Sequence, residues 1–224
     1  MSVQLLLLVP ALNLPVLELP TWLQGTATTR RPSEAIELRD ALIAGGGGDD
    51  LETLVQACCQ ARVPFRAELL GDGELWRATP VRGKIPRWQR NAELLPVLRN
   101  RAGQAYSLSS GGDAGSVINY GEVLGRAFYF RAEGTFTRAA VSVGAKSCPL
   151  DFDVSISQGG VVVGGLPFFT SAISGAGYLR CLYLDEDIRI FESPNDSPDK
   201  WEESGLVVVQ VRDALFDDAV DGAL

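Results

Sequence analysis

The sequence contains no histidine, and cationic residues are scarce in it. Histidine is the commonest general base and metal ligand, so its absence excludes every Ser-His or Cys-His arrangement. The 20 Lys and Arg face 28 Asp and Glu, which gives a formal net charge of −8 at pH 7. Nucleic-acid partners need clustered cations, so this balance argues against them. We therefore expect a protein that is not an enzyme and has no cofactor, no metal and no nucleic-acid partner.

Cysteine is also sparse, with four residues in 224. Four cysteines do not make a disulfide framework in a chain of this length. Cys58 and Cys59 are adjacent in a helical pattern, and Cys148 and Cys181 lie near predicted strands. We expect all four to be small buried residues or reduced thiols.

Residues 1–32 contain no uninterrupted hydrophobic run long enough to cross a bilayer. The apolar run 5–9 is closed off by prolines at 10, 15 and 20, whereas a spanning helix needs about 20 apolar residues. No basic segment precedes the run, as a secretory signal would require. Residues 26–31 are hydroxylated, basic and free of acids, which is typical of the end of an organelle transit peptide. The alternative is a proline-rich arm that packs on the domain or on a partner.

Residues 33–64 have the pattern of a helical hairpin. Ala35, Leu38 and Leu42 share one face, with Pro32-Ser33 as the predicted N-cap and four glycines at 45–48 after the segment. A second apolar stripe begins after Asp49 or Asp50 and is ended by Pro64; it consists of Leu51, Leu54, Val55, Cys58 and Cys59.

From residue 65 the hydrophobic period changes to two. The predicted strands are 65–70, 74–79, 105–109, 116–122, 127–133, 135–143, 150–157, 160–166, 179–184, 188–191 and 206–211, and glycine-rich turns at 71–73, 111–113, 134 and 159–160 separate several of them. Short strands at regular spacing with little helix between them predict an antiparallel barrel or sandwich over 65–213. An acidic tail, 214–224, follows. The fold class is mainly β.

The end of the chain reads as a meander of three strands. Two alternating runs meet at the triplet Asp185-Glu186-Asp187, and the run 206–211 is apolar on both faces, as in a central or barrel-closing strand. The segment 183–190, Tyr-Leu-Asp-Glu-Asp-Ile-Arg-Ile, with this valine-rich strand resembles the C-terminal signature of the plastid lipid-associated proteins, the PAP/fibrillin family. Residues 73–78, Gly-Glu-Leu-Trp-Arg-Ala, and residues 117–120, Val-Ile-Asn-Tyr, resemble two earlier motifs of that family in the same order.

The resemblance covers about residues 34–213 and has several implications. It implies a lipocalin-like barrel, a plastid location at thylakoids or plastoglobules, and a small hydrophobic ligand such as a prenylquinone, a carotenoid or an acyl lipid. It also implies that an aspartate of the last hairpin contacts the ligand. The expected ligand-binding residues are Trp76, Phe168, Phe169, Tyr183, Asp185, Asp187 and Arg189.

The acidic triplet itself leaves three alternatives open. It has no calcium-loop spacing, and one hairpin cannot supply two carboxylates across a cleft. Strand alternation places Tyr183, Asp185, Asp187 and Arg189 on one face, predicted to point outward, with Leu184, Ile188 and Ile190 on the other face. The triplet is then a structural turn with an Asp–Arg189 pair, the rim of a ligand site, or a catalytic group.

Two further segments carry alternatives. The segment 81–100 concentrates basic residues around a tryptophan, and its candidate membrane-surface residues are Arg82, Lys84, Arg87, Trp88 and Arg90. The alternative is a solvated loop with Trp88 anchored in the core. Phe168 and Phe169 line a barrel mouth or fill the core.

Three functions follow from these patterns. The first is a lipid-binding module that takes a hydrophobic ligand or adsorbs to a lipid surface. The second is a structural subunit of a plastid protein complex, with the barrel plugged by its own aromatic side chains. An enzyme of lipocalin-like shape is the third.

Overall fold

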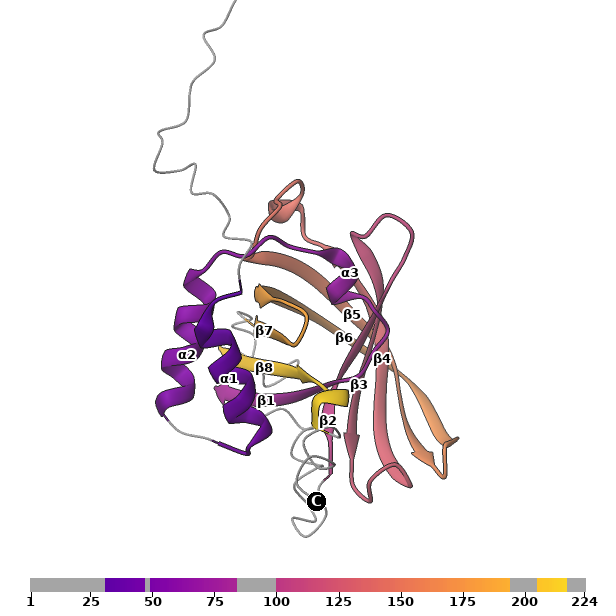
Figure 1. Ribbon diagram of the computed structural model, residues 1–224. Coiled ribbons are helices and arrows are strands. Elements are labelled where there is room, and N and C mark those ends of the chain that lie inside the picture. The colour runs from indigo at the N-terminus through magenta and orange to yellow at the C-terminus, as the bar shows by residue number, and fades with distance from the viewer. Residues whose placement is uncertain (1–30, 47–48, 84–99, 194–204, 217–224) are drawn as a thin grey trace, which may run out of the picture.

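The computed structural model describes residues 31–46, 49–83, 100–193 and 205–216, and these form one closed antiparallel β-barrel with helices packed on its outside (Figure 1). Eight strands follow one another around the barrel in chain order, and the last strand pairs with the first. The predictions of a mainly β fold, of an antiparallel barrel and of a barrel-closing last strand are therefore confirmed.

The elements have the following bounds. The helices are α1 (Ser33–Ile43), α2 (Asp49–Gln60), α3 (Ala67–Leu70) and the 3₁₀ turn η2 (Ala140–Ser142). The strands are β1 (Trp76–Arg82), β2 (Ala102–Leu108), β3 (Ala114–Glu122), β4 (Phe128–Arg138), β5 (Leu150–Val163), β6 (Leu166–Leu184), β7 (Ile188–Ser193) and β8 (Leu206–Arg212).

The helical hairpin predicted for 33–64 is present as α1 and α2. The predicted face of α1, with Ala35, Leu38 and Leu42, is buried. The stripe of α2 also packs into the main apolar cluster, with Leu51, Val55 and Cys58 buried and Leu54 and Cys59 partly buried. The predicted N-cap contact is absent, because Pro32 occupies the cap position and no side chain caps the first turn.

The hairpin packs against the outer face of β7 and β8, which makes both faces of these strands buried. Cross-strand partners project to the same side of a sheet, so the pairs Ile190–Val209 and Arg189–Gln210 lie on opposite faces. Gln210 lines the interior of the barrel, whereas Val209 belongs to the cluster that includes the helices. Val207, Val209 and Val211 thus face the helices and not the interior.

Aromatic rings fill part of the barrel interior. Tyr106 packs edge-on against Phe136 at a centroid distance of 5.2 Å and also contacts Phe191. Phe136 in turn contacts Phe152, which lies 6.0 Å from Phe65. All but Phe65 are buried, so this cluster, together with Leu150, is the packed portion of the barrel.

The predicted strand pattern is wrong at several places. The predicted strand 65–70 ends in the helix α3, whose Ala, Glu and Leu residues are good helix formers. The predicted turns at Gly134 and at 159–160 lie inside the long strands β4 and β5. A Cβ on Gly134 would lie 2.0 Å from the carbonyl oxygen of Ser155, so this glycine permits close backbone approach where the strand register shifts. The predicted strand 135–143 ends at Arg138, before η2.

Candidate functional site

A cavity of about 90 Å³ lies inside the barrel next to the aromatic cluster. Seven strands, β2 to β8, contribute to its wall. The apolar part of the wall comes from Val117, Ala132, Val154, Ile156, Leu179, Phe191, Leu206 and Val208, and the polar part from Gln104, Tyr106, Asn119, Ser193 and Gln210. The wall includes small residues such as Ala132 and Gly177, which leave space that larger side chains would fill.

The polar part of this wall is a connected row of side-chain amides. Gln210 donates from Nε2 to Oε1 of Gln104, and Gln104 donates from Nε2 to Oδ1 of Asn119. The hydroxyl of Tyr106 donates to the same Gln104 oxygen over 3.2 Å. Within the described part of the chain, Nδ2 of Asn119 donates no hydrogen bond. The row therefore ends at the cavity with a donor that a ligand oxygen could use.

Arg189 lies behind this amide row and is fully buried. Its Nε donates to Oε1 of Gln210 over 2.6 Å, and its two terminal nitrogens donate to the backbone carbonyls of Gln104, over 2.9 Å, and Leu70, over 3.2 Å. The guanidinium also lies over the rings of Trp76, at 4.4 Å, and Tyr106, at 4.8 Å. No carboxylate among the described residues forms an ion pair with it.

Burial lowers the pKa of Arg189 to about 10, because the charged form is removed from water. The guanidinium therefore remains protonated at neutral pH. It is a positive charge inside the barrel that rests on carbonyl oxygens and aromatic faces. Such an arrangement favours a negative or strongly polar ligand group in the adjacent cavity.

The turn of the last hairpin lies at Asp185 to Asp187, as predicted, but the carboxylates of Asp185 and Asp187 lie next to Arg31 and α1 and not at the cavity. Asp185 is buried and accepts hydrogen bonds from the Tyr183 hydroxyl and from the backbone N–H of Asp187 and Ile188, each over 2.8 Å. Arg31 forms ion pairs with both Asp185 and Asp187, and Nη1 of Arg39 lies 2.7 Å from Asp187. These contacts tie the hairpin to the helices.

Two predictions about this hairpin are wrong. Tyr183, Asp185 and Arg189 were predicted to share an exposed face, but all three are buried. A register shift between Cys181 and Tyr183 places Tyr183 opposite Ile190 on the outer, helix-covered face, while Arg189 points inward. The predicted pairing of an aspartate with Arg189 is therefore absent, and the aspartates pair with Arg31 and Arg39 instead.

The ion pairs of Asp187 lead to a prediction about pH. Burial opposes ionisation of this carboxyl, but the hydrogen bonds from Arg31 and Arg39 outweigh it, so the pKa of Asp187 is lowered. A lowered folded-state pKa stabilises the fold above the unfolded value of about 3.9, and that contribution disappears as pH falls through the folded value. Urea unfolding should therefore show wild type more stable than Asp187→Asn at pH 6, and the difference should shrink progressively as pH falls below about 3.9. A constant difference across this range would contradict the linkage.

The other predicted ligand residues do not line the cavity. Trp76 is fully buried between Arg189 and Arg212, whose guanidinium lies 4.5 Å from the ring centroid, and it therefore serves packing. Phe168 and Phe169 are 80% and 59% exposed on the hairpin of β5 and β6. The core-filling alternative is therefore wrong, and neither residue lines the interior cavity.

Of the candidate membrane-surface residues, Arg82 alone belongs to the described part of the chain. It ends β1, and its guanidinium nitrogens lie 3.1 Å from Glu52 and 3.5 Å from Glu192. Lys84, Arg87, Trp88 and Arg90 lie outside the described residues.

The four cysteines are free, as predicted. Cys58, Cys148 and Cys181 are buried and Cys59 is partly buried. The sulfur atoms of Cys148 and Cys181 are 4.0 Å apart. Burial raises the pKa of Cys58 to about 12, so this thiol stays protonated and unreactive at neutral pH.

The amide residues of the cavity were missed by the sequence analysis. Gln210 could have been found, because it is a lone polar residue in the middle of the apolar run 206–211. Gln104 and Asn119 offered no such signal, since each lies in a strand of mixed polarity. They become a site only when the register Gln104–Asn119 brings them together.

Comparison with known proteins adds no identification, because no family model, curated protein or solved structure matches the chain. Among the described helices, none has the length and apolar character needed to cross a membrane. No group of three or more metal-ligating side chains is present in the same residues.

Proposed function

We propose that this chain is a non-catalytic lipid-binding protein that holds one small amphipathic molecule inside its barrel. The observation that carries the proposal is the interior cavity, which has an apolar wall on one side and the row Gln104, Asn119 and Gln210 with Arg189 behind it on the other. Such a division suits a ligand with an apolar chain and a carboxylate or carbonyl end, because the apolar part supplies affinity and a few polar groups set orientation.

The size of the cavity narrows the ligand class. Its volume, about 90 Å³, is below the roughly 300–1,000 Å³ of typical pockets for drug-sized ligands. A slender acyl chain needs the least widening of the walls, so the proposal favours an acyl lipid over a carotenoid or a prenylquinone. The resemblance to the plastid lipid-associated proteins supports a lipid ligand and, with it, a plastid location at thylakoids or plastoglobules.

A first test identifies a bound molecule. Folded protein should be extracted with organic solvent and the extract analysed by mass spectrometry. The proposal expects an acyl lipid in stoichiometric amount. A protein that carries no lipid and binds none when lipid is offered would instead be a structural subunit, in which the aromatic cluster plugs the barrel.

A second test fills the cavity. Ala132→Leu adds a larger side chain to the cavity wall, so the affinity for a fluorescent fatty acid should fall by about tenfold, or about 1.4 kcal/mol. The matched control is Ala176→Leu, because Ala176 is exposed on β6 and does not line the cavity. Fluorescence titration measures both affinities, and circular dichroism checks that both variants are folded. Equal affinity of the two variants would show that the ligand binds elsewhere.

A further inference from the structure

The outer part of the β5–β6 hairpin extends beyond β7 and carries no charge. The 26 residues from 154 to 179 contain no Asp, Glu, Lys or Arg. The two strands pair with each other along their length, but β7 pairs with β6 only from Arg180 to Leu184. In Figure 1 this hairpin projects from the body of the molecule at the lower right, on the side away from α1 and α2.

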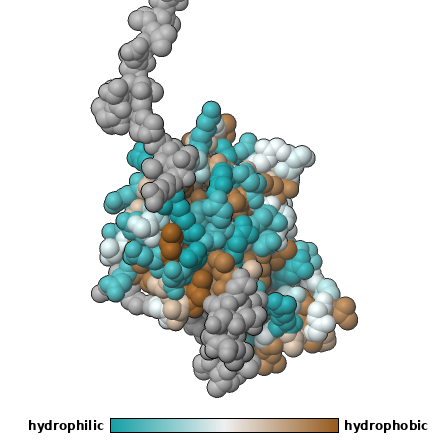
Figure 2. Space-filling view, in the orientation of Figure 1, coloured by the Kyte–Doolittle hydropathy of each residue, from teal (hydrophilic) through white to brown (hydrophobic). Residues whose placement is uncertain are grey.

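The far end of this hairpin is apolar and exposed. Every residue from Leu166 to Thr170 is exposed, so neither face of the ribbon is covered at this point. The exposed apolar residues of this end are Leu124, Val163, Leu166, Phe168 and Phe169. Leu124 belongs to the adjacent turn, which the hydrogen bond from the N–H of Gly164 to the carbonyl of Ala127 holds against the hairpin. Figure 2 shows brown, apolar residues at this corner.

The backbone of this end is poorly suited to pairing with a strand of another protein. Pro167 lacks an N–H, and two register shifts interrupt the ladder of β5 and β6, at Ile156/Gln158 and at Val161/Val162. Prolines and bulges are the features by which proteins protect strand edges from pairing. A flat protein surface would also cover one face of the ribbon and leave the other in water. Acyl chains surround an inserted ribbon on both faces.

A cationic pocket of about 420 Å³ adjoins the same end. Gly165 of the hairpin turn lines it together with Arg101, Arg126 and Arg131. Arg101 is held by ion pairs to Glu122 and Asp213, but Arg126 has no ion pair within the described residues. Within the same residues, Arg131 forms an ion pair with the partly exposed Glu133 alone, at 2.9 Å. Exposed pairs of this kind are worth about 0–1 kcal/mol, so Arg131 can exchange partners at little cost.

The pocket also contains a buried hydroxyl without a hydrogen-bond partner. Tyr120 lines the pocket and is 6% exposed, and its hydroxyl has no hydrogen-bond partner among the residues that the structure describes. Burial raises the pKa of Tyr120, so the hydroxyl keeps its proton and remains a donor. An unpartnered buried donor beside two available guanidinium groups fits an anionic oxygen group.

We infer that the end of the β5–β6 hairpin enters a lipid surface and that the adjoining pocket binds the anionic headgroup of a lipid in that surface. Leu166, Phe168 and Phe169 would lie at the depth of the headgroup and upper acyl region, about 5–10 Å into the surface. Arg126, Arg131 and the Tyr120 hydroxyl would contact the headgroup. This docking surface is separate from the interior cavity, so it holds whether or not the barrel carries a ligand.

The test is flotation of the full chain with phosphatidylcholine vesicles, with and without phosphatidylglycerol. Wild type should bind the anionic vesicles more tightly. Phe168→Ser combined with Phe169→Ser should weaken binding to both kinds of vesicle by about tenfold or more, because two large apolar side chains no longer leave water. Arg126→Gln combined with Arg131→Gln should lower the affinity for anionic vesicles by about fivefold per arginine and leave the affinity for neutral vesicles unchanged. Tyr120→Phe should reduce the preference for anionic over neutral vesicles.

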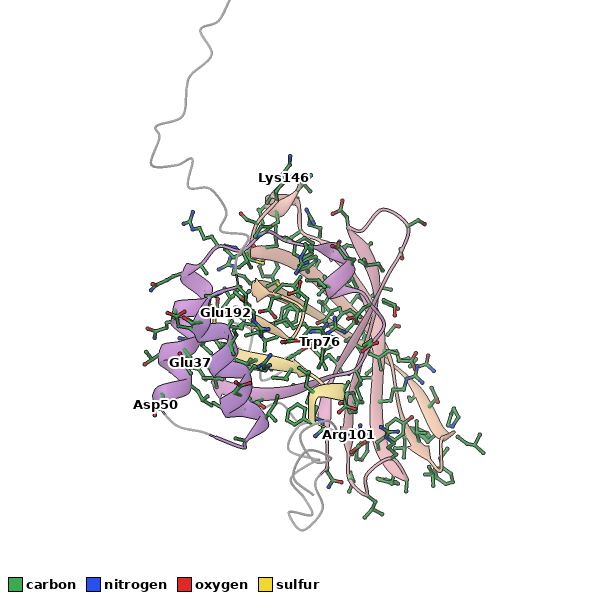
Figure 3. The ribbon with its side chains drawn as sticks, viewed as in Figure 1. Glu37, Asp50, Trp76, Arg101, Lys146 and Glu192 are labelled. Atoms are coloured by element: carbon green, nitrogen blue, oxygen red, sulfur yellow. The ribbon has the colours of Figure 1, made fainter. Side chains whose placement is uncertain are left out.

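Matched controls come from the opposite end of the barrel. Val141 and Val143 are 79% and 73% exposed in and beside η2, and Lys146 lies near them at the top of Figure 3, far from Arg101. Val141→Ser with Val143→Ser, and Lys146→Gln, should leave vesicle binding unchanged.

Three outcomes would overturn the inference. Binding that survives the two Phe→Ser changes would remove the hairpin from the contact. If the two Phe→Ser changes abolished self-association but left vesicle binding intact, this end would be an interface between copies of the chain. Binding of soluble glycerol phosphate without binding of vesicles would assign the pocket to a free anion. Fatty-acid affinity of the hairpin variants, measured alongside, should match wild type, which separates this surface from the cavity.

Discussion

Replacing Arg189 with methionine should lower the free energy of unfolding by about 3 kcal/mol. Three buried acceptors, the carbonyl oxygens of Leu70 and Gln104 and the side-chain oxygen of Gln210, would lose their donor. Each unsatisfied buried acceptor costs about 1–3 kcal/mol, and relief from burying a charge offsets part of this sum. The measurement is urea unfolding followed by tryptophan fluorescence.

A control is Arg180→Met. Arg180 is more than one-third exposed and its Nε lies 2.7 Å from Asp151, so its loss should cost no more than about 1 kcal/mol. An Arg189→Met variant as stable as this control would show that the amide row and carbonyls rearrange without the guanidinium.

The same variant separates the role of Arg189 in ligand binding from its role in stability. If the guanidinium attracts the anionic end of an acyl ligand, Arg189→Met should lower the affinity for a fatty acid more than the affinity for the matching fatty alcohol. Equal loss for both would mean that the side chain supports the cavity wall and nothing more.

The barrel, the helical hairpin and the turn at 185–187 could be predicted from the sequence because each depends on a local period. Alternation in 188–191 and 206–211 correctly separates the residues of the two faces, such as Ile190 from Arg189. It does not say which face is inside. The usual rule puts the apolar face in the core, but here α1 and α2 cover the outer face of β7 and β8, so Ile190 and Val209 pack outward and Arg189 is buried inside. Only the packing of distant elements decides this.

The hairpin of β5 and β6 illustrates a second limit. Two adjacent aromatic residues after a proline indicate burial, because aromatic side chains supply much of the core in most domains. The sequence did contain a contrary signal, the absence of charge over 154–179, but an uncharged run fits a buried strand as well as a projecting one. How far the strands extend beyond their neighbours depends on where β7 stops pairing, and residues distant in the chain determine that.

Phe152 and Phe168 should respond oppositely to truncation. Phe152 is buried against Phe65 and Phe136, so Phe152→Ala should cost about 3–5 kcal/mol, since it opens a cavity in the aromatic cluster. Phe168 is 80% exposed, and Phe168→Ala should change stability by no more than about 0.5 kcal/mol. Urea unfolding of the two variants under identical conditions checks both values.

The stability of Phe168→Ala also tests the proposed role of the hairpin. A small stability change at Phe168 with unchanged fatty-acid affinity is expected, because this residue does not line the cavity. A large loss of stability at Phe168 would mean that the end of the hairpin is covered by protein in solution, and a lipid surface could then not reach it. An exposed phenylalanine that contributes neither to stability nor to the cavity fits a surface used for association.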